Sequence, residues 1–481
     1  MLPSPPHDLD VLIRRFCERW RPERVAEQDA LQAILAEYGA TQTVDDAPYV
    51  DYLKLLVASH PEGRTRADLA TALNLEGADQ ASVRLYQLRG RLNRDLMALF
   101  SNPLQYQVYV VPDQQQAPEL AELERREVLR PLSAFTLLGR TRAAPHADPR
   151  LREGCAQYDR GDYLDCAGTL VHLLPEIHRP GRMTVGELTL LLYHLAKTLL
   201  KLNWYGLLDS LLTGPYQRFS TEVVNGDLEA ERLQIMAIGL RQRSRPADAA
   251  ACLREAVRLL QRAVMQHRHP AIALTLADSE VLLVQTSLDE VVDQARPAEV
   301  RRLRLREAHD ALSRAKRYYE QWWSEAQAPE PVHYEGRLNG TAAFLTVARS
   351  VLEPATLTSE DWKLAERNAR MGYEPARYRK PFGVVAGHYA HATVLLAKAH
   401  WHHVGRDSGT AEESVVALRA GKRLLQSARK RYLDTGEVTL GGAYEGPRFY
   451  RLLEIFDNLL SNGLPSLWPD PRTAALLTPL V

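Results

Sequence analysis

The sequence has 481 residues, which leaves room for about three domains of ordinary size. It carries 60 Lys and Arg against 60 Asp and Glu, which excludes a net charge that would by itself attract a polyanionic or polycationic partner. Hydrophobic residues make up 45% and charged residues 25%, and these values exclude a mainly disordered chain.

We expect a cytoplasmic protein that makes no contact with a membrane. No Lys or Arg precedes an apolar segment at the start of the sequence, as it would in a secretory signal. The most apolar stretch, Leu188–Leu202, contains charged or polar residues such as His194 and Lys197 and is shorter than the roughly 20 residues of a membrane span. The four cysteines show no C-x-x-C spacing, so we interpret them as buried thiols in a reducing compartment.

Ala, Leu, Arg and Glu dominate most of the chain, and apolar residues recur at spacings of three and four. This periodicity predicts a mainly α-helical protein. Residues 1–45 are expected to form a helical extension, with one helix over Asp8–Trp20 and a second over Pro22–Tyr38. The second helix opens with Pro at its first position and an acidic residue in its first turn.

The segment Tyr49–Val111 is the most informative part of the chain. A helix over Tyr49–Ser59 is followed by a second that opens at the capping sequence Thr65–Asp68, and Asp79 is suited to cap a third that reaches about Leu99. Aromatic and β-branched residues then predict a strand over 104–111. Short helices followed by a strand are the layout of a winged helix-turn-helix domain, which we place at residues 46–112.

The third helix carries two stripes of residues. Its apolar stripe faces the predicted core and consists of Ala81, Leu85, Leu88, Leu92 and Leu96. A second stripe, at offsets of three, seven and ten, consists of Arg84, Gln87, Arg91 and Arg94. With Arg89 there are four arginines and no acid between Ala81 and Arg94. Arginine binds guanine edges or phosphates and glutamine pairs with adenine, so these five residues are the predicted DNA contacts. The alternative is a solvated basic face on an ordinary amphipathic helix.

Two stretches of this segment, Leu53–Ala70 and Ser82–Leu96, resemble the winged-helix domain of bacterial transcriptional regulators of the SARP type. In that family a helical repeat domain follows the winged helix. The resemblance implies that the helix rich in leucine and arginine enters the major groove of double-stranded DNA. It therefore implies a DNA-binding role for Arg84, Gln87, Arg91 and Arg94.

Residues 113–148 are expected to connect two domains. Their first part, Asp113–Pro118, is polar, and Glu119–Arg130 is predicted to be a charged connecting helix. A second break, Gly139–Pro149, contains Gly and Pro and marks the main domain boundary.

From residue 149 to residue 465 the pattern changes to successive helices joined by short turns, which predicts a helical repeat array. Tyr158–Leu170 places a Gly-Asp-Tyr turn between two helices, with the small Ala167 after it, and resembles a tetratricopeptide repeat. The same pattern recurs at Arg245–Ala256, and more weakly at Ala308–Ala315 and Trp362–Ala369. Residues 466–481 are expected to be a C-terminal tail. The predicted fold is therefore mainly α, with a winged helix-turn-helix followed by a tetratricopeptide-like solenoid.

Such an array leaves a concave surface suited to a peptide, a partner protein or a small effector. Two features are candidates to line it, although each has an ordinary structural explanation. The first is an aromatic group that also fits the junction between repeats: Tyr318, Tyr319, Trp322 and Trp323. The second is two pairs of histidines at three-residue spacing, His388 with His391 and His400 with His403. No acidic residue lies within their helix, so we expect no metal site there.

No phosphate-binding loop, nucleophile elbow or zinc-protease helix is found, so we expect no enzymatic activity and no cofactor. The sequence favours a cytoplasmic DNA-binding transcriptional regulator that acts as a homodimer, whose array dimerises or senses a partner or ligand. The alternative is a non-enzymatic scaffold that binds peptides or proteins through the array and uses the winged helix for protein contacts.

Overall fold

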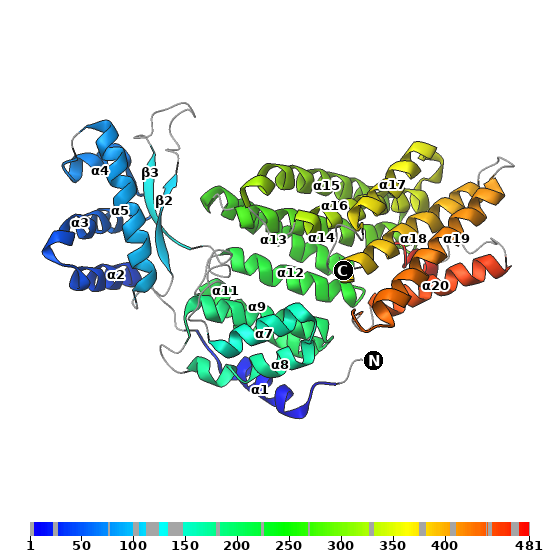
Figure 1. The fold of residues 1–481 in the computed structure, drawn as a ribbon, viewed down its shortest axis with the longest axis horizontal. Coiled ribbons are helices and arrows are strands. Elements are labelled where there is room, and N and C mark those ends of the chain that lie inside the picture. The colour runs from blue at the N-terminus through cyan, green and yellow to red at the C-terminus, as the bar shows by residue number, and fades with distance from the viewer. Residues whose placement is uncertain are drawn as a thin grey trace.

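A computed structural model of the chain shows a mainly α protein with one small antiparallel sheet of three strands near its N-terminal region, and helices make up 81% of the residues that the structure describes (Figure 1). The structure describes residues 4–22, 27–75, 77–99, 105–111, 125–132, 148–178, 183–222, 226–267, 270–326, 331–374, 381–404, 410–438, 440, 445–462 and 471–480.

The N-terminal unit consists of four helices, one short 3-10 turn and the sheet. In chain order these are α2 (Glu27–Thr41), η1 (Val44–Asp46), α3 (Ala47–Ala58), β1 (Arg64–Thr65), α4 (Arg66–Ala72), α5 (Ala78–Ala98), β2 (Tyr106–Val111) and β3 (Arg126–Pro131). Apolar residues of α2, α3, α4 and α5 meet the inner face of β2 and β3 in one core. The predicted helices and strand of this segment are thus confirmed.

The strand β3 was not expected from the sequence. It pairs with β2 along its whole length, from Tyr106 opposite Pro131 to Val111 opposite Arg126, and the strand order is β1-β3-β2. The helix predicted over Glu119–Arg130 is therefore wrong from Arg126 onward, and residues 119–124 lie outside the described part. Pairing with β1 on one side and β2 on the other holds the residues of β3 in a strand, although their charged composition favours a helix locally.

The two predicted helix caps have different outcomes. The hydroxyl of Thr65 accepts a hydrogen bond of 3.1 Å from the backbone N–H of Asp68, as expected for the start of α4. Asp79 does not cap α5, because that helix begins one residue earlier and follows Gly77. Gly77 has φ of 77°, a left-handed conformation that glycine adopts at little cost. The turn before α5 is therefore set by a glycine and not by a side-chain cap.

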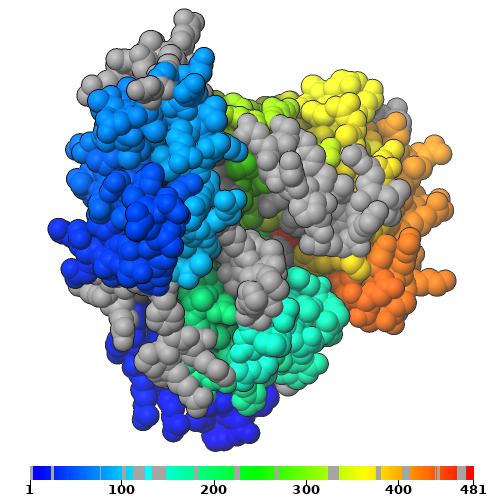
Figure 2. All heavy atoms as spheres, turned by 60° about the vertical axis from the view of Figure 1, so that its left-hand side comes forward, coloured from blue at the N-terminus to red at the C-terminus, as the bar shows by residue number. Residues whose placement is uncertain are grey.

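The expected extension of residues 1–45 is divided between two parts of the molecule. Helix α1 (His7–Arg19) packs its apolar side against the first helices of the array, and Arg218 donates a hydrogen bond of 3.1 Å to the carbonyl of Trp20. Helix α2 instead belongs to the core of the N-terminal unit. Figure 2 shows the result as two separate dark blue regions, with α1 at the bottom beside the array. The prediction of one extension is wrong, because each helix buries its apolar face against a different core.

The array follows in chain order. Its helices are α7 (Pro149–Arg160), α8 (Tyr163–Val171), η3 (Leu174–His178), α9 (Val185–Lys201), α10 (Tyr205–Thr213), α11 (Pro215–Glu222), α12 (Gly226–Gln242), α13 (Pro246–His267), α14 (Pro270–Val292), α15 (Ala298–Ala326), α16 (Pro331–Leu352), η4 (Pro354–Thr356), α17 (Ser359–Gly372), α18 (Pro381–Val404), α19 (Thr410–Ala428), η5 (Arg429–Leu433), α20 (Glu445–Asn462) and α21 (Pro471–Ala474). Consecutive helices from α7 to α20 pack side by side, as in Figure 1.

Small residues set the approach of the first helix pair. Ala167 is fully buried, as the predicted turn requires. Gly154 on α7 is equally important, because a Cβ atom there would lie 2.5 Å from Cδ2 of Leu170. In contrast, Ala308–Ala315 lies inside the long helix α15 and contains no turn, so the weak similarity proposed for that stretch is not a repeat boundary.

Helix α14 forms the centre of the array. It is long and apolar enough to cross a membrane by length and composition, but 83% of its apolar window is buried inside the protein. It also buries two carboxylates. Glu280 pairs with Arg314 of α15 at 2.7 Å, and Glu290 lies 2.9 Å from Arg296 and 3.2 Å from Arg304. Buried charges of this kind are stable only when paired, so these contacts fix α15 against α14.

The four cysteines are all free. Cys166 is buried as expected, whereas Cys17, Cys155 and Cys252 are only partly buried. Burial raises the pKa of the Cys166 thiol to about 11 and that of Cys17 to about 12, so both are protonated at neutral pH.

The expected tail does not extend away from the molecule. Its residues Thr473–Leu480 are buried against the array except for Ala475, and Leu477 is completely enclosed. In Figure 1 the C-terminus accordingly lies in the middle of the array and not at its edge.

Candidate nucleic-acid interface

Helix α5 divides its residues between a buried and an exposed face. The apolar stripe predicted from the sequence is confirmed, because Ala81, Leu85, Leu88, Leu92 and Leu96 are all buried. The side chains most exposed to solvent on this helix are those of Asp79, Gln80, Val83, Tyr86, Gln87 and Arg94, with Gly90 between the last two.

Arg89 is not part of the exposed face. Its Nη1 atom lies 3.2 Å from Oε1 of Glu127 on β3, and its side chain is 18% exposed. Glu127 is fully buried, also pairs with Nε of Arg66 at 3.2 Å, and accepts a hydrogen bond from the hydroxyl of Tyr52. The ion pair of Arg89 therefore links α5 to the sheet. Arg89 faces the sheet and does not lie with the predicted DNA contacts that are exposed to solvent.

The pKa shifts of Glu127 and Tyr52 are those of buried groups that hold the unit together. Burial raises the pKa of the Glu127 carboxyl, while the Tyr52 hydrogen bond and the two arginines act in the opposite direction. Burial also raises the pKa of Tyr52 well above its usual value, and the neighbouring carboxylate adds to this effect. The carboxylate is held by donors on every side, so it binds α3, α4, α5 and β3 together.

Arg91 lies at the edge of the exposed face and is engaged within the unit. Its Nη2 atom lies 2.6 Å from Oδ1 of Asp46, and its guanidinium lies 4.3 Å from the ring centre of Tyr49. Asp95, one turn further along, lies 3.6 Å from its Nε atom. The hydrogen bond to Tyr49 and the Asp46 carboxylate raise the pKa of Arg91. Arg91 thus holds the start of α3 against α5.

The three remaining predicted contacts lie together on the solvent side of α5. Nη1 of Arg84 donates to Oε1 of Gln87 at 3.3 Å, an exposed contact between successive turns. Arg94 is exposed and forms no hydrogen bond or ion pair with the residues that the structure describes. Arg84, Gln87 and Arg94 are therefore the side chains of the original five that a partner can reach.

Three residues of this face were missed in the sequence. Val83 is 58% exposed and Tyr86 is 66% exposed, although both are large and apolar. Gly90 lies between them and Arg94, and a Cβ atom at this position would have no neighbour within 4 Å. Their position in the sequence could have identified Val83 and Tyr86, because both fall outside the leucine stripe of the helix. An ordinary solvated face would carry polar side chains at these positions.

A hollow of about 560 Å³ opens beside the first turns of α5. Asn74, with φ of 53°, and Gly77 shape the turn that precedes it, and Leu75 is held by a hydrogen bond of 2.9 Å from its N–H to the carbonyl of Ala70. The hollow is lined by Asn74, Leu75, Asp79, Gln80, Val83, Arg84 and Gln87. Its lining joins the exposed Val83 to the partly exposed Arg84 and the exposed Gln87.

The sheet brings further basic residues to this unit. Arg64 on β1 lies opposite Glu127 in the strand register, and Arg126 on β3 lies opposite Thr65. Arg125, next to Arg126, is exposed, and its carbonyl accepts a hydrogen bond of 2.8 Å from the N–H of Arg66. These residues were not identified from the sequence, because Arg125 and Arg126 fell within the predicted helix.

Of the two predicted histidine pairs on α18, three side chains are partly buried and one is exposed. His388 Nδ1 is 2.8 Å from the carbonyl of Val384 within the same helix. Burial lowers the pKa of His391 and that of His400 to about 4, and His403 is exposed. Among the residues that the structure describes, no group of three or more His, Cys, Asp or Glu side chains is arranged to hold a metal ion.

The aromatic group of α15 is partly buried. Tyr318 packs against the cluster formed by α12, α13 and α14, and Tyr319 and Trp322 are half-buried. The side chain of Trp323 lies outside the described part. The arrangement of Tyr318 agrees with packing between helices.

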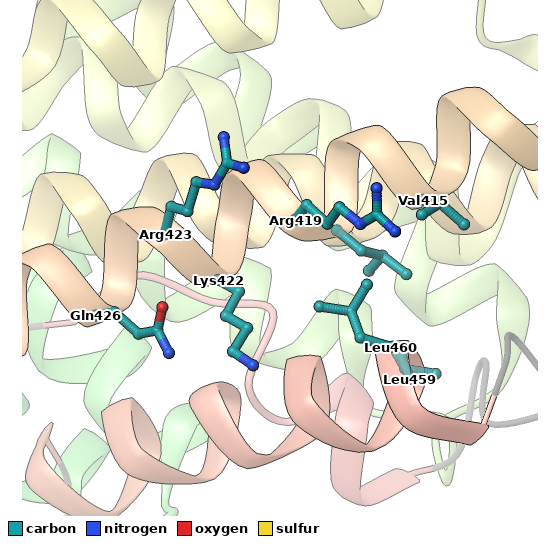
Figure 3. A pocket seen from close by; sticks show the side chains of 8 residues that line it. Val415, Arg419, Lys422, Arg423, Gln426, Leu459 and Leu460 are labelled. Carbon is teal, nitrogen blue, oxygen red and sulfur yellow. The ribbon is translucent and has the colours of Figure 1, made fainter.

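A second concave surface lies between α19 and α20 (Figure 3). This hollow of about 370 Å³ has Leu418, Leu459 and Leu460 among its lining residues, while Arg419 and Arg423 are exposed beside it. Lys422, from the same helix, lies 2.6 Å from Asp457 of α20. The basic residues around this hollow favour anionic groups. The hollow was not predicted from the sequence.

Comparisons with known proteins add no relative to this description. No family model matches the chain, no curated protein matches it, and no solved structure matches it.

Proposed function

We propose that the N-terminal unit is a winged helix-turn-helix that binds double-stranded DNA, with α5 in the major groove and the β2–β3 hairpin beside the phosphate backbone. The observation that carries this proposal is the pair of exposed side chains Gln87 and Arg94, with the partly exposed Arg84 beside Gln87, all outside the stripe of buried leucines. The order α3-β1-α4-α5-β2-β3 supports it, because this order places a hairpin after the helix that would enter the groove.

The proposed contacts have distinct chemical roles. Gln87 is suited to pair with adenine, and Arg84 beside it is suited to guanine or phosphate. Arg94 and Arg125 are suited to phosphates, because each is exposed at the end of an element. Arg89 and Arg91 position α5 through Glu127 and Asp46 and are no longer proposed as contacts.

The array then supplies the regulatory part of a cytoplasmic transcriptional regulator. It would bring two copies together on a repeated or palindromic site, or sense a partner whose binding shifts the DNA-binding population. Light scattering on the purified chain, with and without a bound duplex, tests the proposed homodimer.

Selection from a library of random duplexes, followed by fluorescence anisotropy on the enriched sequence, tests DNA binding. The affinity of the parent chain should fall steeply between about 50 and 200 mM salt. Arg94→Ala should weaken binding to all sequences and reduce the salt slope by about 1, whereas Gln87→Ala should cost about 1–3 kcal/mol at one base pair.

Arg317→Ala is the matched control, since Arg317 is an exposed arginine on a helix of the array. It should leave DNA affinity unchanged. If the library yields no enriched or salt-sensitive duplex, the proposal of DNA binding is wrong.

A scaffold function is the second candidate, and a specific observation favours it. Val83 and Tyr86 expose large apolar surface beside the hollow at the start of α5, and exposed aromatic side chains are typical of protein-binding sites. A scaffold would lose a protein partner with Tyr86→Ser and keep it with Arg94→Glu. A DNA-binding unit would lose its duplex with Arg94→Glu.

A further inference from the structure

The segment Pro471–Leu480 lies on the array in the manner of a bound peptide. Its contacts come from helices that are far apart in the sequence: α12, α18 and α20. Two leucines of the segment, Leu476 and Leu477, join the main core cluster of the array, and so does Leu480. The segment therefore fills a site that other parts of the chain have built.

Three side chains bind the main chain of this segment. The hydroxyl of Tyr389 donates to the carbonyl of Leu476 at 2.5 Å. Arg448 Nη2 donates to the carbonyl of Thr478 at 2.7 Å and lies 2.8 Å from its hydroxyl oxygen. Nη2 of Arg241 donates to the carbonyl of Pro479 at 3.0 Å. Main-chain carbonyls are common to every peptide, so these contacts fix its path and not its identity.

Each of the three donors also contacts a residue outside the segment. Arg241 is 3% exposed, pairs with Asp289 of α14, and donates to Oε1 of Gln285 at 3.1 Å. The guanidinium of Arg448 lies 6.0 Å from the ring centre of Tyr389, which is itself buried. Oriented donors of this kind lower the ordering cost of binding a peptide.

We propose that this surface of α12, α18 and α20 is a peptide-binding site, occupied in cis by Pro471–Leu480, which accepts in trans a segment with the same turned backbone and the same leucine spacing. The three carbonyl contacts provide affinity for a backbone that follows the same turn, whatever its side chains. The enclosed positions of Leu476, Leu477 and Leu480 select two adjacent leucines followed by a third at three residues' distance. The proposal is independent of DNA binding by the N-terminal unit.

The test uses the full chain with a recognition sequence for a specific protease introduced into residues 463–470. Before cleavage, this variant should have the helix content and melting temperature of the parent. A labelled synthetic peptide with the sequence of residues 471–481 is then titrated before and after cleavage, and binding is followed by anisotropy.

The uncleaved chain should bind the peptide about 100-fold more weakly, because the tethered segment competes at millimolar effective concentration. After cleavage the peptide should bind saturably and displace the original segment. A peptide with all three leucines changed to Ala should not compete. Arg448→Met should weaken binding about 10-fold after cleavage without changing helix content, since it removes two hydrogen bonds from the rim of the site.

Two results would overturn the proposal. One is a cleaved chain that unfolds, because the segment would then be an integral part of the core. The other is a cleaved, folded chain that neither releases its segment nor takes up the labelled peptide after prolonged incubation.

Discussion

Asn93 of α5 uses both ends of its side-chain amide to bind the main chain of Val108 on β2. Its Nδ2 atom donates to the Val108 carbonyl at 3.1 Å, and its Oδ1 atom accepts from the Val108 N–H at 2.7 Å. Since β2 is the outer strand of the order β1-β3-β2, the amide replaces the neighbouring strand that this edge lacks. Asn93 thereby links the exposed helix directly to the hairpin.

Asn93→Ala should destabilise the N-terminal unit by about 1–3 kcal/mol, because it leaves a buried N–H and a buried C=O of Val108 without partners. Urea unfolding followed by far-UV circular dichroism measures the change. Gln87→Ala is the matched control on the solvent side of the same helix and should leave stability nearly unchanged. Equal stability of both variants would show that the Asn93 hydrogen bonds do not hold the strand.

Glu127→Ala should destabilise the N-terminal unit by about 3–5 kcal/mol, because it leaves the buried Arg66 and the partly buried Arg89 without their carboxylate. All seven tryptophans lie outside residues 27–132. Unfolding of this unit should therefore reduce the circular dichroism signal at a lower urea concentration than the tryptophan fluorescence of the array. Coincident transitions at the parent midpoint would contradict the role given to Glu127.

Gly90→Ala should raise stability by about 0.5–1 kcal/mol, because alanine is the better helix former and its Cβ meets no atom within 4 Å. If α5 enters the major groove, the same change should weaken DNA binding, since a methyl group is added to the contact face. Thermal melting and anisotropy on the selected duplex measure the two effects. A variant that is more stable and binds DNA as tightly as the parent would place Gly90 outside the interface.

The array should lose stability as the pH falls from about 6.5 to about 4. Burial lowers the pKa of His391 and that of His400 to about 4 in the folded chain, whereas an unfolded histidine titrates near 6.5. The unfolded state thus binds more protons in this window, and the stability present above pH 6.5 is lost toward pH 4.

Because both side chains are only partly buried, the expected loss is about 1–2 kcal/mol for each. Replacing both with Gln should flatten the dependence of the melting temperature on pH. His172→Gln, on an exposed histidine of the first helices, should not. An unchanged slope in the double variant would assign the acid sensitivity to other groups.

The arginines of α5 differ in their surroundings, and only part of this difference could be predicted from the sequence. Helical periodicity alone identified the buried leucines of α5, because a period of 3.6 residues separates two faces whatever the helix packs against. It could not separate Arg89 from Arg94. That difference depends on Glu127, which lies 38 residues beyond Arg89 and on a strand that the sequence did not predict.

The sequence by itself determined the helical class and the position of the short helices and β2, since these follow from local periodicity and turn residues. Only the tertiary structure decided the strand β3, the division of α1 and α2 between two cores, and the burial of Pro471–Leu480. Each of these features depends on contacts with residues that are far away in the chain. A local sequence pattern cannot indicate which distant apolar face or polar group a segment will contact.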